Sequence, residues 1–253
     1  MKKNLIRKSD FKKYYRQLIL KKIGIVGQKK IFKGKVLVIG AGGLGCPLIQ
    51  YLAYSGVGSI GIVDDDKIEL SNLSRQVLFT KNDIGKFKTE VIKRVAKRIN
   101  KDIKISIYTK RLDSSNIGNI LKNYHVVCDG TDNFKSRLLI NDYCVKNKKV
   151  LISSAINKFD GQLFHFDFRK KTPCYRCFMP KDPLNDVNCE SEGIMTTLAG
   201  IAGSMQANEV LKSILDINSN LIGKIMIFNS LNSDFRKVRL SKNPDCKNNH
   251  YHV

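Results

Sequence analysis

Residues 35–45 read Lys35-Val-Leu-Val-Ile39-Gly40-Ala-Gly-Gly-Leu-Gly45, an apolar run that is followed at once by a glycine-rich turn. The apolar run predicts a short strand that is buried on both faces of a sheet. Residues 47–56 predict a helix with a proline in its first turn, and residues 59–63 predict a second strand. A strand, a helix and a further strand in this order form a βαβ unit, which requires a parallel sheet.

The glycine-rich turn has the GxGxxG spacing at Gly40, Gly42 and Gly45. Glycines permit a tight turn and let the backbone approach a phosphate group at the positive N-terminus of the following helix. Asp64 lies nineteen residues past Gly45, at the end of the second predicted strand, where its carboxylate can bond ribose hydroxyls. The turn therefore predicts a nucleotide site, and NAD, FAD and ATP are all compatible with it.

The alternation of helices and strands continues along the chain. It predicts helices at residues 11–25 (one helix or a helix-turn), 87–100, 117–122 and 134–146, and strands at residues 103–108, 125–128 and 150–153. After Asp160, strand-like runs at residues 162–168 and 224–228 flank an apolar helix at residues 195–215. We expect a Rossmann-like, doubly wound α/β fold, whose mostly parallel sheet carries an antiparallel C-terminal extension. Its expected parts are a helical segment (1–30), a Rossmann-like domain (31–160) and a C-terminal part (161–253).

The composition narrows the class of protein. The chain has 253 residues, of which 42% are hydrophobic and 26% are charged, so it can bury a core. No apolar run reaches the roughly 18 residues of a membrane span, and the basic start lacks the apolar stretch of a signal peptide. The formal charge of +23 comes from lysines spread along the whole chain, which is typical of a solvated surface. We therefore expect a cytoplasmic protein with no membrane partner and no specific nucleic-acid partner.

The loop after the second predicted strand favours one nucleotide chemistry. It reads Asp64-Asp-Asp-Lys-Ile-Glu-Leu-Ser-Asn-Leu-Ser-Arg75-Gln76, with Asn72 and Arg75 near its end. A dehydrogenase does not need these two residues there, whereas a phosphoryl-transfer enzyme must neutralise charge on the phosphate oxygens in the transition state. An NAD- or FAD-dependent oxidoreductase with the same glycine turn is the more distant alternative.

Four motifs in order carry a family resemblance: residues 40–45 (GAGGLG), 64–76 (DDDKIELSNLSRQ), 84–88 (IGKFK) and 130–133 (GTDN). From about Tyr15 to Cys246 the chain resembles the ThiF/MoeB/HesA family. These relatives of the ubiquitin-activating enzymes adenylate the C-terminal glycine of ubiquitin-like sulfur-carrier proteins. The resemblance implies ATP and Mg²⁺ as cofactors, a carrier ending in Gly-Gly as the partner, and a homodimer. It also makes the middle domain the ATP-binding domain and the C-terminal part the carrier-binding part.

The resemblance assigns roles to individual residues. It implies that the nucleotide is bound by Gly40, Gly42, Gly43, Gly45, Asp64, Asn72, Arg75, Lys88 and Asp132. Asp64 would bind the ribose, while Arg75 would act as an arginine finger on the phosphates. Lys88 would hold the phosphates as a point charge, and Asp132 would bind Mg²⁺. The alternatives are that Lys88 is a surface charge and that Asp132 caps the helix at residues 134–146.

Arg16, in Tyr15-Arg16-Gln17, matches an arginine that family members donate across a homodimer interface. A surface charge is the alternative for this residue. Cys189 matches a cysteine that some relatives use for a thioester or acyl-persulfide link with the carrier. Glu190 and Glu192 beside it disfavour a thiolate, so an unreactive loop cysteine is the alternative. The candidate catalytic residues are thus Arg75, Lys88, Asp132, Arg16 and Cys189.

Cysteines in the second half of the chain predict a metal site. Cys174 and Cys177 form a CxxC pair on a turn between expected strands, and Cys246 follows later. Family members close a structural zinc site with two CxxC pairs, but here Asn249 stands at the fourth position. Either His250 or His252 completes a Cys₃His zinc site, or the site has decayed and binds no metal.

The expected activity is ATP-dependent adenylation of a sulfur carrier. Residues 188–195 and 234–237 resemble the members that serve molybdopterin synthesis slightly better than the members of the thiamine thiazole pathway, which is the alternative. No rhodanese-like segment follows Cys246, so we expect a separate protein to donate the sulfur. A non-catalytic relative that only binds a carrier or nucleotide is disfavoured, because Arg75, Lys88 and Asp132 are all intact.

Overall fold

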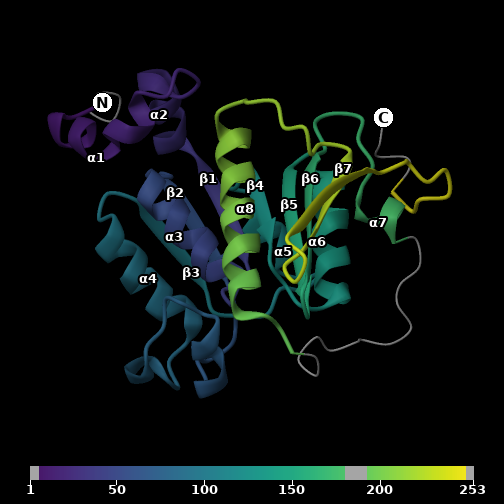
Figure 1. Ribbon diagram of the computed structural model, residues 1–253, viewed down its shortest axis with the longest axis horizontal. Coiled ribbons are helices and arrows are strands. Elements are labelled where there is room, and N and C mark those ends of the chain that lie inside the picture. The colour runs from purple at the N-terminus through teal and green to yellow at the C-terminus, as the bar shows by residue number, and fades with distance from the viewer. Residues whose placement is uncertain (1–5, 180–192, 249–253) are drawn as a thin grey trace.

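The structure is a computed structural model that describes residues 6–179 and 193–248. Across these residues eight strands form one sheet, in the order β3-β2-β1-β4-β5-β6-β7-β8 (Figure 1). The strands are β1 (Lys35–Ile39), β2 (Ser59–Val63), β3 (Lys104–Tyr108), β4 (Val126–Asp129), β5 (Val150–Asn157), β6 (Asp160–Asp167), β7 (Lys224–Asn229) and β8 (Asp234–Arg239). The first five are parallel, and antiparallel pairing joins β5 to β8. The predicted α/β fold is confirmed.

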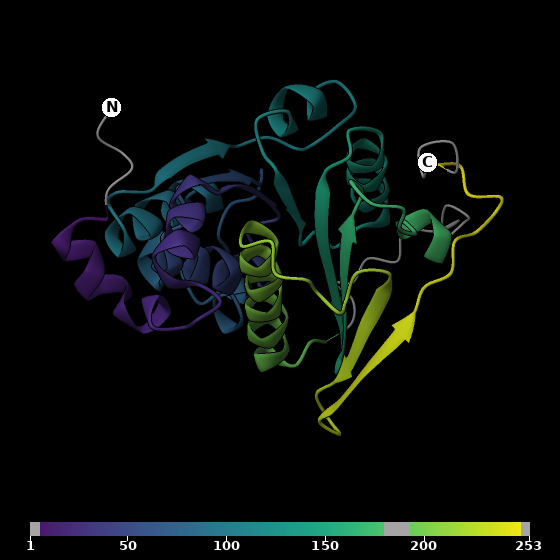
Figure 2. The same cartoon turned by 90° about the horizontal axis from the view of Figure 1, so that it is seen from above.

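Helices cover both faces of the sheet (Figure 2). One face packs against α2, α3, α4 and α8, and the other packs against α5, α6 and α7. The helices are α1 (Lys8–Leu18), α2 (Gly24–Lys33), α3 (Gly45–Ser55), η1 (Leu70–Ser74), η2 (Lys81–Asp83), α4 (Lys88–Ile99), α5 (Ile117–Leu121), α6 (Phe134–Lys146), α7 (Tyr175–Phe178) and α8 (Thr196–Ile214), where η marks a 3₁₀ helix.

The central strand β1 is buried on both faces, as its apolar run predicts. Val36 and Val38 belong to the apolar cluster under α3 and α8, whereas Leu37 and Ile39 belong to the cluster under α5 and α6. None of the four is more than 3% exposed. Burial of such a side chain contributes about 1.5–3 kcal/mol, so β1 anchors both layers of the core.

Residues 11–25 form a helix and a turn, one of the two predicted alternatives, since α1 ends at Leu18 and α2 begins at Gly24. Two elements differ from their predictions. The CxxC pair does not lie on a turn between strands, since residues 175–178 form the one-turn helix α7. The outer strand β8 was not predicted, because all six of its side chains are exposed and no apolar alternation marks it.

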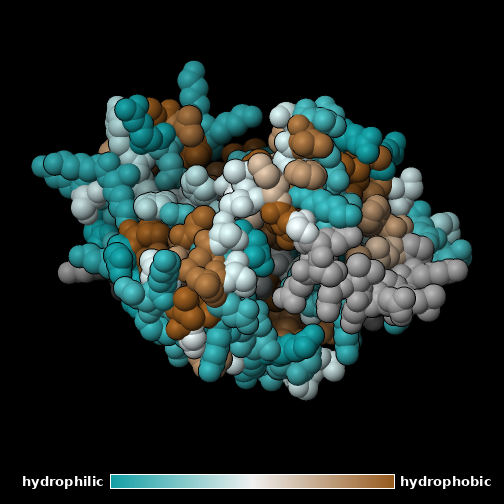
Figure 3. Space-filling view, turned by 60° about the horizontal axis from the view of Figure 1, so that its bottom comes forward, coloured by the Kyte–Doolittle hydropathy of each residue, from teal (hydrophilic) through white to brown (hydrophobic). Residues whose placement is uncertain are grey.

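Hydrophilic side chains are spread over the face of the molecule seen in Figure 3, with apolar patches between them. This agrees with lysines that are dispersed along the sequence instead of gathered in one stripe. Within the described part of the chain, every helix falls short of the length and hydropathy that a membrane crossing requires.

A buried polar cluster ties α8 to β6. The Glu209 carboxylate on α8 contacts His165 Nδ1 at 2.7 Å, Lys212 Nζ at 2.6 Å and Ser219 Oγ at 2.5 Å. Burial alone would raise the pKa of Glu209, but hydrogen bonds with His165, Lys212 and Ser219 lower it to about 2. Ionised Glu209 therefore stabilises the folded state above its ordinary pKa of 4.5, and this contribution is lost as the pH falls toward 2.

We expect Glu209→Gln to lower the free energy of unfolding at pH 7 by about 2–3 kcal/mol, because the variant loses the charge that the cluster stabilises. The difference between the variant and the wild type should shrink between pH 4.5 and pH 2, as wild-type Glu209 becomes protonated. Urea unfolding at several pH values measures both quantities. Glu90→Gln on the exposed face of α4 is the matched control, and an unchanged difference at pH 3 would contradict the assignment.

Candidate active site

A cavity of about 730 Å³ opens at the carboxyl ends of β1, β2 and β4. The strand order reverses between β1 and β4, so the cavity lies at the topological switch point of the sheet. Open parallel sheets bind their ligands at this point. Eight of the predicted site residues line the cavity: Gly40, Gly42, Gly43, Asp64, Asn72, Arg75, Lys88 and Asp132.

The glycine turn is built from close backbone contacts. Gly40 has φ of +90°, and a β-carbon there would lie 2.7 Å from the carbonyl oxygen of Gly130. A β-carbon at Gly45 would lie 2.2 Å from the carbonyl oxygen of Gly40. Only glycine fits both positions, so the turn brings β1, the start of α3 and the loop after β4 together. Gly45 itself does not line the cavity, and its missing side chain serves this packing.

The Asp64 carboxylate is fixed beside the glycine turn. Its Oδ2 accepts the backbone N–H of Ala41 at 2.7 Å, and its Oδ1 accepts the N–H of Asp66 at 2.9 Å. Burial raises the pKa of Asp64, while the charge of Lys88 and the two backbone hydrogen bonds oppose that rise. The carboxylate thus has a set orientation toward the cavity, where its remaining lone pairs can accept hydrogen bonds from hydroxyl groups.

Lys88 is the first residue of α4, and its side chain is buried instead of lying on the surface. The Nζ atom is 2.7 Å from Asp66 Oδ2, and the backbone N–H of Lys88 donates to the carbonyl of Asp66. An ammonium group in a cavity wall, already desolvated on one side, is suited to hold an anionic ligand. The surface-charge alternative for Lys88 is therefore wrong.

The 3₁₀ helix η1 carries Asn72 and leads into Arg75. The Asn72 side chain is buried, and its Oδ1 accepts the backbone N–H of Glu69 at 3.2 Å. Arg75 Nη1 donates to the carbonyl of Ser71 at 3.2 Å, and the Arg75 stem packs over Gly43. The guanidinium therefore lies beside the glycine turn, where its other N–H donors can bind a ligand.

Asp132 lies in the loop between β4 and α6. The N-cap of α6 is Asn133, whose side chain accepts the backbone N–H of Ser136 at 2.9 Å. The helix-cap alternative for Asp132 is therefore wrong, because its neighbour performs that role. Asp132 is exposed to the cavity, and its Oδ1 accepts a long 3.3 Å hydrogen bond from Asn133 Nδ2. The carboxylate therefore offers hard oxygen ligands to a cation such as Mg²⁺.

Arg137 on α6 also lines the cavity, although its sequence context did not predict a site residue. Its guanidinium donates to Ser153 Oγ at 3.0 Å and to the carbonyls of Thr131 and Ser154. Ser153 Oγ in turn donates to Asp129 Oδ2 at 2.7 Å. This buried network holds the ends of β4 and β5 together directly before Asp132. Sequence offers no signal for it, because a lone arginine on a helix resembles a solvated charge.

Lys110 and Arg111 are two further cations of the cavity wall that the sequence analysis missed. They follow the end of β3, just as Asp64 follows the end of β2. Carboxyl ends of neighbouring parallel strands meet at one edge of a sheet, so their position directly after a strand could have pointed to them. With Arg75, Lys88 and Arg137 they bring five cationic side chains to the cavity.

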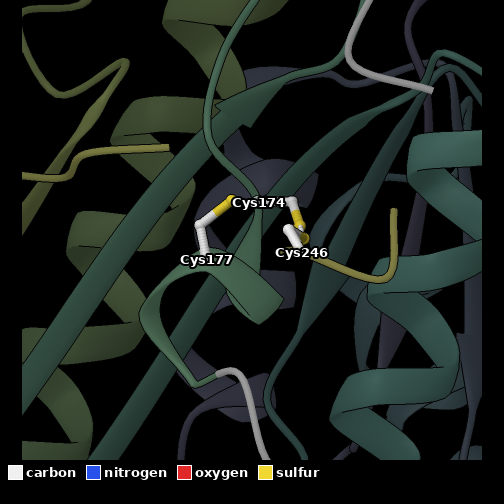
Figure 4. A group of neighbouring side chains, drawn as sticks. All are labelled: Cys174, Cys177 and Cys246. Atoms are coloured by element: carbon white, nitrogen blue, oxygen red, sulfur yellow. Dashed lines mark hydrogen bonds between the residues drawn. The ribbon is translucent and has the colours of Figure 1, made fainter. Parts of the chain in front are cut away.

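The three predicted cysteine ligands do not line the cavity, although their neighbours Tyr175 and Phe178 do. The three side chains turn toward one another (Figure 4). Cys174 is the N-cap of α7, Cys177 lies within α7, and Cys246 comes from the C-terminal segment. The three sulfurs lie within 4.8 Å of one another. The Cys174 and Cys246 sulfurs are 3.7 Å apart. A tetrahedral zinc site with Zn–S bonds of about 2.3 Å places sulfurs about 3.8 Å apart, so the spacing fits zinc.

Several predicted residues lie elsewhere. Arg16 is exposed on α1 and does not line the cavity. Cys189, His250 and His252 lie outside the described residues. Asn249, at the expected fourth ligand position, also lies outside them. The last described residue is Asn248, whose Nδ2 lies 3.8 Å from Cys174 Sγ and donates to Asp142 Oδ1 at 2.7 Å.

Comparisons with known proteins agree with this geometry. The model of the ThiF family matches residues 14–248. The "Sulfur carrier protein adenylyltransferase" of Thermus thermophilus is 40% identical over 245 residues, covering 94% of this chain and 90% of that protein. The "Adenylyltransferase and sulfurtransferase MOCS3" of Caenorhabditis briggsae is 41% identical over 244 residues, covering 95% of this chain. The chain spans only 61% of the length of this second relative.

Solved structures show the same architecture. A crystal structure of Escherichia coli MccB with MccA-N7isoASN has a TM-score of 0.82 at 25% identity, and the match covers 93% of this chain and 74% of that chain. The crystal structure titled "MccB + ATP" has a TM-score of 0.78 at 23% identity and supports the fold alone. The chain therefore belongs to the ThiF family, among enzymes that are named as adenylyltransferases.

Proposed function

We propose that the protein is an ATP-dependent adenylyltransferase that activates the C-terminal glycine of a ubiquitin-like sulfur-carrier protein. The observation that carries the proposal is the cavity itself, in which Asp64, Arg75, Lys88 and Asp132 surround the glycine turn at the switch point of the sheet. The name of the relative from Thermus thermophilus supports the carrier as substrate, since that protein matches along most of its length.

The reaction needs charge stabilisation more than proton transfer. The terminal carboxylate of the carrier attacks the α-phosphorus of ATP, the bond from that phosphorus to the bridging oxygen breaks, and pyrophosphate leaves. A carboxylate is already ionised at neutral pH, so no general base is required. The protein positions the two reactants and neutralises the phosphate oxygens through Arg75 and Lys88. Asp132 would hold Mg²⁺, which when bound shields the charge of the phosphates.

We further propose molybdopterin synthesis as the pathway, with the thiazole-pathway carrier of thiamine synthesis as the alternative. Support for this finer assignment comes from residues 188–195 and 234–237, which resemble the molybdopterin-type members. Cys189 lies within the first of these stretches, and we propose that it acts after adenylation, in transfer of sulfur to the carrier. The C-terminal part, residues 161–253, would receive the carrier.

A homodimer completes the proposal, with Arg16 reaching the active site of the partner. Exposed apolar side chains on α1, on α2 and in the turn between them support this assignment: Phe11, Tyr15, Ile19, Leu20, Ile25 and Val26. Scattered single apolar residues are normal on a surface, but a group on neighbouring helices favours an interface. Arg16 lies among them on α1, so an interface there would carry its guanidinium into the contact.

ATP–pyrophosphate exchange tests the proposed function. We expect exchange that depends on a carrier ending in Gly-Gly, with the molybdopterin-type carrier supporting faster exchange than the thiazole-type carrier. Faster exchange with the thiazole-type carrier would assign the protein to the thiamine pathway. Absence of exchange with both carriers, in a folded protein that binds ATP, would contradict adenylation.

Two substitutions test the assigned roles. We expect Arg75→Ala and Asp132→Ala each to lower the exchange rate by about 10²-fold or more, on the order of 3 kcal/mol, because each removes a group that meets developing charge. Arg98→Ala, on the exposed face of α4 and outside the cavity, is the control and should leave the rate unchanged. Rates near that of the wild type for either cavity variant would remove the role.

Zinc is proposed at the three cysteines because their spacing fits a tetrahedral site. We expect elemental analysis of the purified protein to find close to one zinc per chain, and Cys246→Ser to lose most of it. Cys144→Ala removes a buried cysteine of α6 outside the cluster and should keep the metal. A zinc content far below one per chain in the wild type would mean that the site has decayed.

A further inference from the structure

Gln76, directly after Arg75, is a buried polar residue with an unmet hydrogen bond. It is 3% exposed and lines the cavity. Its side-chain carbonyl oxygen, Oε1, has no hydrogen-bond partner within residues 6–179 and 193–248. An unpaired buried acceptor costs about 1–3 kcal/mol, so a bound ligand that supplies a donor would recover this free energy.

In the described part of the chain, two other buried glutamines also have an unpaired Oε1, but their surroundings differ. Gln28 donates to the carbonyl of Ser55 at 3.0 Å, and Gln206 donates to the carbonyls of Asp129 and Ile152. Both side chains join pieces of backbone inside the fold, and neither lines the cavity. Gln76 is distinguished from them by its place in the wall of the nucleotide site.

The Gln76 amide lies against the glycine turn. Its Nε2 is 3.5 Å from the place that a β-carbon on Gly42 would occupy, while the Arg75 stem packs over Gly43 in the same way. The backbone N–H of Gln76 donates to the carbonyl of Asn72 at 2.9 Å, which fixes the start of the side chain. The carboxamide is therefore held against the glycine turn, which we expect to face the phosphates of ATP.

The chemistry of the reactants limits what Oε1 can bind. The triphosphate presents only acceptor oxygens, which repel a carbonyl oxygen. Four cations of the cavity wall (Arg75, Lys88, Lys110 and Arg111) are available for those phosphate oxygens. The carrier supplies a donor next to its reacting carboxylate, namely the peptide N–H of its terminal glycine.

We propose that Gln76 is a substrate-positioning residue whose Oε1 accepts the peptide N–H of the carrier's terminal glycine. This inference rests on the proposed function and specifies how the carrier's last residue is held in line with the α-phosphate. A site that bonds a substrate N–H discriminates against an analogue that lacks it, because its buried acceptor then stays unpaired. Gln76 thereby contributes to selection of a carrier that ends in an ordinary peptide.

The test is a double-mutant cycle that combines a substitution of Gln76 in the protein with a change of the carrier's terminal residue. One carrier ends in Gly-Gly, and its ligated counterpart ends in Gly-glycolate, which replaces the terminal N–H by an ester oxygen and keeps the carboxylate. For the wild type we expect the glycolate carrier to lower kcat/KM in ATP–pyrophosphate exchange by about 10- to 100-fold. In Gln76→Met the Gly-Gly carrier should show a similar loss, and the glycolate carrier should add little to it.

Two further variants sharpen the cycle. Gln76→Glu keeps an acceptor at the same position, so the glycolate penalty should return even if the overall rate falls. Gln28→Met removes a buried glutamine outside the cavity and should show the full penalty of the wild type. ATP binding without a carrier should be unchanged in Gln76→Met, which also reports that this variant is folded.

Several outcomes would overturn the inference. An equal glycolate penalty in the wild type and Gln76→Met would mean that Oε1 does not bind this N–H. Weaker binding of ATP to folded Gln76→Met in the absence of carrier would assign the amide to the nucleotide instead. Exchange by the wild type with neither carrier would overturn the proposed function, and the inference with it.

Discussion

The site depends on close backbone packing at the glycine turn, residues 40–45, where no side chain separates the contacting segments. A β-carbon at Gly45 would collide with the carbonyl of Gly40, and one at Gly203 of α8 would lie 2.3 Å from the carbonyl of Leu44. A β-carbon at Gly40 would collide with Gly130 in the same way. Three segments that are distant in sequence therefore meet at one turn. This contact sets the position of the loop of Asp132 relative to the start of α3.

A buried polar network supports that meeting point from behind. Asp129 accepts hydrogen bonds from Thr131 and Ser153, and Arg137 lies 3.7 Å from its carboxylate. Gln206 of α8 donates to the carbonyl of Asp129, so the same helix that packs on the glycine turn also holds the end of β4. Desolvation offsets much of the attraction in a buried ion pair, so such a network contributes more to position than to stability.

Local sequence patterns predicted the features that depend on neighbouring residues. The apolar run of β1, the glycine turn and Asp64 at the end of β2 are all of this kind, and each lies where it was predicted. Gln76 lies in the loop that follows β2, but its side chain is buried against the glycine turn at Gly42, which is distant in sequence. Sequence does not reveal such tertiary contacts, and the partners of Arg137 from β4 and β5 escape it for the same reason.

Exposure of its side chains explains why strand β8 was not predicted. Strand β8 pairs along its whole length with β7, yet its exposed, mostly charged side chains resemble a loop.

Asp132 and Asn133 are both good helix caps, and only the structure separates the residue that caps α6 from the one that faces the cavity. Cation positions after β3 were open to prediction, because Lys110 and Arg111 follow a strand end as Asp64 does.

The cysteine cluster joins positions that are 72 residues apart, from Cys174 to Cys246. The enclosed loop contains α8, β7 and β8, and therefore includes the helix that packs on the glycine turn. Closing a loop of this length with a firm link removes about 4 kcal/mol of chain entropy from the unfolded state. A metal held by these thiols would thus constrain the segment that packs on the nucleotide site, and loss of the metal would loosen the C-terminal third of the chain before the Rossmann core.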